Sequence, residues 1–238
     1  MKILAIETSH ETGSIALLHG AQLLQRQLEG ASQHSAQALA AIAALLAEAG
    51  LRPGELDAVA FGAGPGAFTG VRLACGIAQG LALGAGLGVA AVGSLDAIAS
   101  QCTAAQLLIA TDARMGEIYC AHFTLDDDGR PHAVDGPHCI RPEELEILPG
   151  DWFGAGSGFA VHGETLQARL GAQLCGSDSA LYPQADEVVR LAVGQVASHS
   201  LLAPELVSPL YVRNKVAFTL AERLAKEADR AGQAGARQ

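Results

Sequence analysis

The chain is poor in aromatic side chains and in positive charge. Aromatic residues make up 4% of its 238 residues, whereas 50% are hydrophobic, so alanine, leucine and glycine must fill most of the core. There are 15 lysines and arginines against 25 aspartates and glutamates, which gives a net charge of −10. Because neutralising phosphates requires lysine and arginine, this balance argues against a protein that wraps nucleic acid directly.

Several catalytic and metal-binding signatures are also missing. The five cysteines form no C-x-x-C pair and their number is odd, which is typical of reduced thiols in a cytosol. No two histidines stand three or four residues apart, so a helical HxxxH or HExxH metal site is absent. The G-x-S-x-G spacing of a serine nucleophile is absent too, because Ser157 lies between adjacent glycines. We therefore predict no catalytic residue and no metal site.

Membrane and export segments are not expected. Glu7 interrupts the first apolar run, so the N-terminus does not have the pattern of a signal peptide. Residues 73–92 carry no charge, which is long enough for a membrane span, but five glycines make this stretch only weakly apolar. We predict a helix, a turn and a strand inside a soluble core, and a cytoplasmic protein.

The charge is distributed unevenly along the chain. Residues 1–101 carry a net charge of −3, residues 102–205 carry −10 and residues 206–238 carry +3. We predict an N-terminal lobe at 1–101, a smaller and degenerate acidic lobe at 102–205, and an extended segment with a terminal helix at 206–238. The basic tail could contact RNA, or it could be a solvated helix or a contact for a protein partner.

The first half of the chain has a regular order of elements. Apolar and alternating runs predict strands at 2–9, 13–18 and 22–28, followed by a helix at 32–50 whose core face includes Leu39. A strand at 57–62, a helix to residue 83, a strand at 89–92 and a helix at 94–101 complete a βββαβαβα pattern. This pattern is typical of the actin-like, hexokinase-like ATPase domain, so we predict an α/β fold with two such lobes.

The second half is harder to interpret. Strands are expected at 107–111 and 117–124, a short strand and a second glycine turn at 151–158, and a helix at 185–199. Residues 136–150 have the composition of a loop.

The stretch from Gly62 to Leu83, GAGPGAFTGVRLACGIAQGLAL, is the most informative. It predicts a glycine turn and then a helix with Thr69 as its N-cap. The turn lacks the lysine of a Walker loop and a complete GxGxxG, so a tight turn is favoured over a phosphate site. Arg72, Gly76, Gly80 and Gly84 recur every four residues and share one stripe. That stripe could pack on the protein's own sheet or helix, or could form a subunit interface.

The end of the first strand offers a second possible phosphate contact. In the actin-like class, the corresponding turn holds phosphate through a carboxylate, a hydroxyl and a glycine. Here the three positions are Glu7, Thr8 and Ser9, with serine in place of glycine. They are candidates for a residual nucleotide site, and Glu7 could equally be a structural carboxylate.

The order and spacing of these motifs resemble one family. The segments are KILAIETS, ETGSIALL, SQHSAQAL, the Gly62–Leu83 stretch and the tail SPLYVRNKVAF. Together they resemble the TsaB family, also called YeaZ. The resemblance implies a non-catalytic partner of a longer paralogue, TsaD, which transfers threonylcarbamoyl to adenosine 37 of tRNAs that read ANN codons.

The same resemblance implies the other partners. An ATPase, TsaE, joins the assembly, ATP and metal are expected in the partner subunits and not in this chain, and tRNA is contacted only indirectly. The partner is held by the first two helices of the N-terminal lobe, here 35–49 and 69–83, and self-pairing there would give a homodimer when the chain is alone. The candidate contact residues are His34, Ala36, Ala40, Ala43, Ala47, Phe68, Thr69, Arg72, Gly76, Gly80 and Gly84.

Two enzymatic alternatives remain open at this point. Glycine turns at Gly62 and Gly154 are compatible with an actin-fold ATP-dependent kinase or ATPase. A peptidase of the glycoprotease superfamily is the other alternative, although no metal or nucleophile signature supports it.

Overall fold

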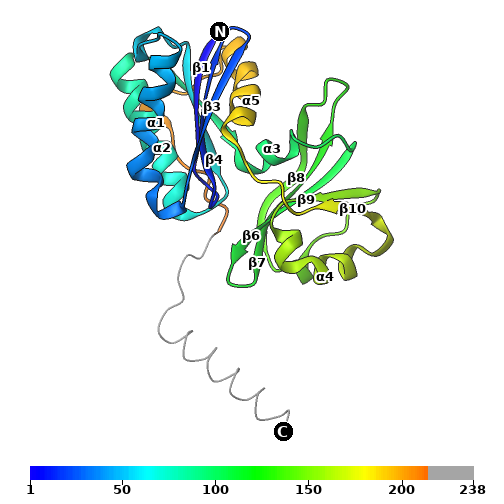
Figure 1. Cartoon of the computed structure of the whole chain (residues 1–238). Coiled ribbons are helices and arrows are strands. Elements are labelled where there is room, and N and C mark those ends of the chain that lie inside the picture. Colours follow the sequence, from blue (N-terminus) through cyan, green and yellow to red (C-terminus); the bar gives the residue numbers. More distant parts are fainter. Residues whose placement is uncertain (214–238) are drawn as a thin grey trace.

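A computed structural model describes residues 1–213 of the protein, and the terminal helix expected after residue 213 lies outside the described residues. Two five-stranded sheets form two lobes that lie side by side (Figure 1). The first sheet has the order β3-β2-β1-β4-β5 and the second has the order β10-β9-β6-β7-β8. We call the parts built on them the first lobe and the second lobe.

The first sheet begins as an antiparallel meander and continues with parallel strands. Strand β1 pairs antiparallel with β2 and parallel with β4, β2 pairs antiparallel with β3, and β4 pairs parallel with β5. The strands are β1 (Lys2–Glu7), β2 (Gly13–His19), β3 (Gln22–Leu28), β4 (Ala58–Gly64) and β5 (Gly88–Gly93).

The second sheet repeats this topology. Strands β6, β7 and β8 form an antiparallel meander, and β9 and β10 continue the sheet in parallel from β6. Their bounds are β6 (Gln106–Arg114), β7 (Glu117–Leu125), β8 (Pro131–Ile140), β9 (Trp152–Ala155) and β10 (Leu174–Asp178). The α/β prediction with two actin-like lobes is therefore confirmed.

Two helices cover one face of the first sheet and a third covers the other (Figure 1). The helices α1 (His34–Glu48) and α2 (Phe68–Ala85) pack over Leu4 and Ile6 of β1. The helix α5 (Ala185–Ala197) packs over Ile3 and Ala5 on the opposite face. Successive side chains of a strand point to opposite faces, so the uninterrupted apolar run in β1 serves both layers.

The remaining helices belong to the second sheet. The helix α3 (Ser94–Ala99) places Leu95 and Ile98 against Phe123, and α4 (Gly158–Leu170) covers the other face. The chain thus exchanges helices between lobes, since α3 packs on the second sheet and α5 returns to the first. The predicted division at residues 101 and 205 differs from this packing, because α5 falls within the range assigned to the second lobe.

Short 3-10 helices complete the structure at Ala31–Gln33, Pro53–Glu55, Pro142–Glu144, Gly171–Gln173 and Pro204–Leu206.

Several local predictions are corrected by the structure. The N-cap of α2 is Ala67 and not Thr69, which lies inside the helix. Leu39 is 59% exposed, so it does not belong to the core face of α1, which is formed by Ala38, Ile42 and Leu45. Strand β8 occupies part of the expected loop at 136–150.

By length and apolarity alone, α2 could cross a membrane. One of its faces is buried on the first sheet, and the opposite face is exposed.

Candidate functional site

The carboxylate of Glu7 joins the ends of β1 and β4. It is fully buried, and its two oxygens accept hydrogen bonds from the Ser9 amide at 2.6 Å and from the Ser94 hydroxyl at 3.0 Å. The Ser94 oxygen in turn accepts from the amide of Gly64 at 3.2 Å. Burial raises the pKa of Glu7, and these hydrogen bonds lower it by less. The carboxylate is thus fully engaged within the chain.

The glycine turn after β4 is pressed against this junction. A side chain on Gly62 would collide with the Glu7 carboxylate, one on Gly66 would collide with Ser9, and one on Gly70 would collide with the carbonyl of Thr8. These glycines are required by close approach within the protein. The absence of a side chain at these three positions is therefore explained by packing within the first lobe.

Further hydrogen bonds lock the two turns together. The Thr8 hydroxyl donates to the carbonyl of Gly70 at 2.7 Å, and the Ala67 amide donates to the carbonyl of Ser9 at 2.8 Å. Glu7, Thr8 and Ser9 therefore lie together, as the sequence predicted, but Glu7 and Thr8 are held by the first lobe. Their role as a residual nucleotide site stays a prediction.

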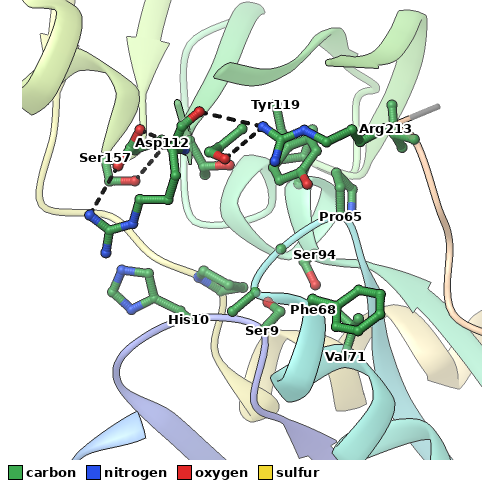
Figure 2. Close-up of a pocket in the computed structure, with 18 of the residues that line it drawn as sticks. Ser9, His10, Pro65, Phe68, Val71, Ser94, Asp112, Tyr119, Ser157 and Arg213 are labelled. Carbon is green, nitrogen blue, oxygen red and sulfur yellow. Dashed lines mark hydrogen bonds and ion pairs between the residues drawn. The ribbon is translucent and has the colours of Figure 1, made fainter. Parts of the chain in front are cut away.

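A cavity of about 510 Å³ lies between the lobes (Figure 2). The first lobe contributes Ser9 and His10 from the β1–β2 turn and Phe68 from the start of α2. The second lobe contributes three hydroxyl groups and the carboxylate of Asp112, and residues 210–213 close one side of the cavity. These other lining residues include Thr111, Asp112, Tyr119, Ser157, Tyr211 and Arg213.

The charges around this cavity are largely paired. The Arg114 guanidinium lies 2.6 Å from Glu11 of the first lobe and 3.3 Å from Asp112. Nε2 of His162 lies 3.6 Å from Asp112, and the amide of Asp112 donates to the Ser157 hydroxyl oxygen at 3.1 Å. Within residues 1–213, no hydrogen bond joins His162 to Ser157, so these side chains are not arranged as a nucleophile and its base.

Across the same described range, no group of three or more histidine, cysteine, aspartate or glutamate side chains is placed to hold a metal ion.

The outer face of α1 and α2 is the other notable surface. A side chain added at Gly76, Gly80 or Gly84 would meet no atom of the described chain within 4 Å. The sequence left open whether these three glycines pack on the protein's own sheet, and that interpretation is wrong. The residues of α2 that face the sheet are Ala74, Cys75, Ala78 and Ala82, all of which are buried.

The structure brings ten of the eleven predicted contact residues to this exposed face. We define the docking face as the exposed predicted residues of α1 and α2 together with two exposed leucines on the same helices. Leu39 and Leu83 are 59% and 64% exposed, and Phe68 is 46% exposed. The docking face consists of Ala36, Leu39, Ala40, Ala43, Ala47, Phe68, Thr69, Arg72, Gly76, Gly80, Leu83 and Gly84.

His34 is the predicted contact residue that differs. It is only 2% exposed and packs beneath Gly13 of β2, where its ring fills the space that a side chain at residue 13 would need. Burial lowers the pKa of His34. It therefore supports α1 from inside and does not belong to the docking face.

Sequence reasoning missed the role of the segment that follows α5. Tyr211 accepts a hydrogen bond from Nε of Arg72 at 2.8 Å, and the Arg72 guanidinium lies 3.6 Å from the centre of the Phe68 ring. The SPLYVR motif was noted in the sequence, but only as part of a resemblance. Nothing in its spacing indicated which helix it contacts.

Two related sheets and a cavity between them define an actin-like protein of two lobes, and comparisons with known proteins identify which kind. The family model for "TsaD: tRNA N6-adenosine threonylcarbamoyltransferase" matches residues 28–219. The Escherichia coli strain K12 "tRNA threonylcarbamoyladenosine biosynthesis protein TsaB" is 34% identical over 226 residues, which cover 92% of this chain and 97% of that protein. The chain belongs to the TsaB family.

Two further relatives agree with this. The Haemophilus influenzae protein of the same name is 34% identical over 232 residues, which cover 92% of this chain and 96% of that protein. The structure of YeaZ from Pseudomonas aeruginosa superposes with a TM-score of 0.79 at 34% identity, covering 88% of this chain and 99% of that chain. The predicted family is thus confirmed.

Proposed function

We propose that this chain is a non-catalytic subunit in the biosynthesis of threonylcarbamoyladenosine in tRNA. Its role is to bind a TsaD subunit through the docking face and so to support threonylcarbamoyl transfer to adenosine 37 of tRNAs that read ANN codons. The observation that carries the proposal is the docking face, which is exposed, apolar and built largely from alanine and glycine.

Composition supports a contact role for this face. A helix on a protein surface normally carries charged residues on its solvent side. Glu48 is the only charged residue of α1 and Arg72 is the only charged residue of α2. Small side chains allow the axis of a partner helix to approach closely, and the exposed Leu39, Phe68 and Leu83 can insert between its side chains.

The chemistry and the other partners follow from this role. In this proposal the predicted N-terminal region (1–101) supplies the interface through α1 and α2, and TsaD carries out the transfer. TsaE binds and hydrolyses ATP, and tRNA is reached only through the assembly in the cytoplasm. The engagement of Glu7 and the pairing of the cavity charges support a chain that does not catalyse the transfer. The same face would pair two copies as a homodimer when TsaD is absent.

The mass of the complex tests the interface. Light scattering is expected to give a dimer for the chain alone and a one-to-one heterodimer after mixing with its TsaD. Gly80→Leu is expected to abolish both the homodimer and the heterodimer, because the added side chain obstructs the docking face. Gly194→Leu is the matched control, since Gly194 is also an exposed helical glycine with open space around it, but it lies on α5 across the sheet.

The outcomes separate interface from fold. Loss of binding in Gly80→Leu alone supports the docking face, whereas binding retained in Gly80→Leu contradicts it. A second assay tests the non-catalytic role by incubating the purified chain with unmodified tRNA, ATP and threonylcarbamoyl-adenylate. Modified adenosine is expected only when TsaD is added, and product without TsaD would contradict the proposal.

A further inference from the structure

The segment Pro204–Arg213, which we call the strap, leaves α5 and runs along the side of α2. The side-chain amide of Gln79 donates to the carbonyls of Pro204 at 3.2 Å and Val207 at 3.0 Å. Further along, the amide of Leu210 donates to the carbonyl of Ala63 at 2.8 Å, at the end of β4. The strap is therefore attached to the first lobe by backbone atoms as well as by side chains.

Tyr211 adds an aromatic attachment at the start of α2. Its hydroxyl accepts from Arg72 at 2.8 Å, and its ring centre lies 6.3 Å from that of Phe68. The Arg72 guanidinium stacks on Phe68 at 3.6 Å, a distance at which the cation is attracted to the ring face. Two residues after Tyr211, the side chain of Arg213 makes its hydrogen bonds with the second lobe.

Arg213 reaches the second lobe. Its guanidinium donates to the carbonyl of Ala113 at 2.7 Å and to the Glu117 carboxylate at 2.6 Å, and Figure 2 shows the side chain lying across Tyr119 toward the end of β6. The side chains of Arg213 and Glu117 are 17% and 33% exposed, so this charge-assisted pair is partly shielded from water. One arginine therefore satisfies both a strand-end carbonyl and a carboxylate of the opposite lobe.

The turn that receives Arg213 has an unusual backbone. Arg114 and Met115 have φ values of 63° and 60°, a left-handed conformation that side chains disfavour. The two-residue hairpin loop Met115–Gly116 has positive φ at both positions, as such loops favour, so the pairing of β6 with β7 fixes this shape. Here this turn follows the carbonyl of Ala113, which accepts a hydrogen bond from Arg213.

Other contacts between the lobes are of a different kind. The helix α3 packs on the second sheet and borders the cavity with Leu95 and Ile98. The Arg114–Glu11 pair also joins the lobes, but both side chains are 72% exposed, so water and salt weaken it. The strap is thus a connection between the lobes that is separate from α3 and better shielded than the Arg114–Glu11 pair.

We propose that the strap sets the separation of the two lobes, with Arg213 as its anchor in the second lobe and Tyr211 as its attachment to α2. Release of Arg213 lets the lobes move apart and opens the cavity between them. Because the strap is bonded to α2, it also connects the docking face mechanically to the β6–β7 turn. This inference concerns the isolated chain and does not depend on the proposed function.

The test is a distance measurement between the lobes of the full chain. Nitroxide labels on noncanonical amino acids at Ala21 and Ala168, both exposed, leave the native cysteines untouched. Labelled protein is diluted into unlabelled protein, so that pulsed electron resonance reports distances within one molecule. The wild type is expected to give one narrow distribution, and Arg213→Ala is expected to give a distribution at least twice as wide with a longer mean distance.

A second variant of the anchor, a control variant and a check of folding make the test specific to the Arg213 contact. Glu117→Gln removes the charge of the partner without touching the strap, and it is expected to broaden the distribution in the same direction as Arg213→Ala. Glu11→Gln weakens the exposed pair with Arg114 without changing the turn that receives Arg213, and it is expected to leave the distribution unchanged. Slow hydrogen exchange of the amides in β1 and β6 checks that both lobes stay folded.

An unchanged distribution in both Arg213→Ala and Glu117→Gln would overturn the proposal. Equal broadening in Glu11→Gln would overturn it as well, because any contact between the lobes would then have the same effect. Broadening confined to the two variants of the Arg213 anchor supports the strap.

Discussion

Gly62 lies so close to Glu7 that the carboxylate occupies the position where a Cβ at residue 62 would stand. The pair lies at the ends of the adjacent parallel strands β1 and β4, where the glycine turn begins. A buried carboxylate needs hydrogen-bond donors, and here the amide of Ser9 and the hydroxyl of Ser94 supply them. Glu7 can therefore occupy this position only because residue 62 has no side chain.

Gly62→Ala is expected to destabilise the protein strongly. The new methyl group must displace a fully buried carboxylate and its donors, so the free energy of unfolding should fall by about 2–4 kcal/mol. Gly80→Ala is the control, because the space around Gly80 is open and alanine is the better helix former. It should raise the free energy of unfolding by about 0.5–1 kcal/mol. Urea unfolding at concentrations where the chain is monomeric measures both, and equal effects would contradict this interpretation.

The first half of the fold could be predicted because its elements have strong local signals. Strand β1 is an uninterrupted apolar run, and the glycines around residue 64 mark the turn before α2. Strand β8 lacked such a signal, since it lies at the edge of the second sheet and most of its side chains are at least partly exposed. Gly136 and Pro137 interrupt it as well, so its composition indicates a loop.

The docking face could be predicted in outline but not in every residue. The family resemblance implied contact residues on the first two helices, and the small residues at helical spacing in α2 were compatible with an exposed face. Leu39 was assigned to the core because it is apolar and lies three residues before Ile42, but the buried residue one turn before Ile42 is Ala38. The strap could not be derived, because Arg72 and Tyr211 are 139 residues apart and no local pattern specifies such a contact.

The stability of the protein should depend on the ionisation of Glu7. Burial holds the pKa of Glu7 above the 4.5 of an unperturbed glutamate, so the unfolded chain releases this proton at lower pH than the folded chain. As pH rises from 4.5 toward the folded pKa, the free energy of unfolding should fall relative to Glu7→Gln, which does not titrate. Urea unfolding of both proteins across this range gives the difference. A difference that stays constant with pH would mean that burial does not control this carboxyl.

His34 should act in the opposite direction of pH. Burial lowers its pKa below the ordinary 6.5, so in the unfolded chain it gains a proton at higher pH than in the folded one. The stability that neutral His34 contributes is complete above 6.5 and should be lost progressively as pH falls toward the folded pKa. His34→Gln should remove this component of the acid dependence. NMR titration of the ring gives an independent check, since an ordinary pKa in the folded protein would contradict the prediction.

Leu39 and Leu45 lie on the same helix, but they should affect the protein in different ways. Leu45 is fully buried in the core cluster beneath α1, whereas Leu39 is 59% exposed on the docking face. Leu45→Ala leaves a cavity and should lower the free energy of unfolding by about 2–5 kcal/mol. Leu39→Ala removes a side chain that makes few contacts within the chain, so the free energy of unfolding should change by less than about 0.5 kcal/mol. If Leu39 inserts into a partner, the same substitution should weaken TsaD binding by about fivefold or more in calorimetry, since truncation of an interface anchor costs over about 1 kcal/mol. Unchanged affinity together with unchanged stability would exclude Leu39 from the interface and would confine docking to the remaining residues of the face.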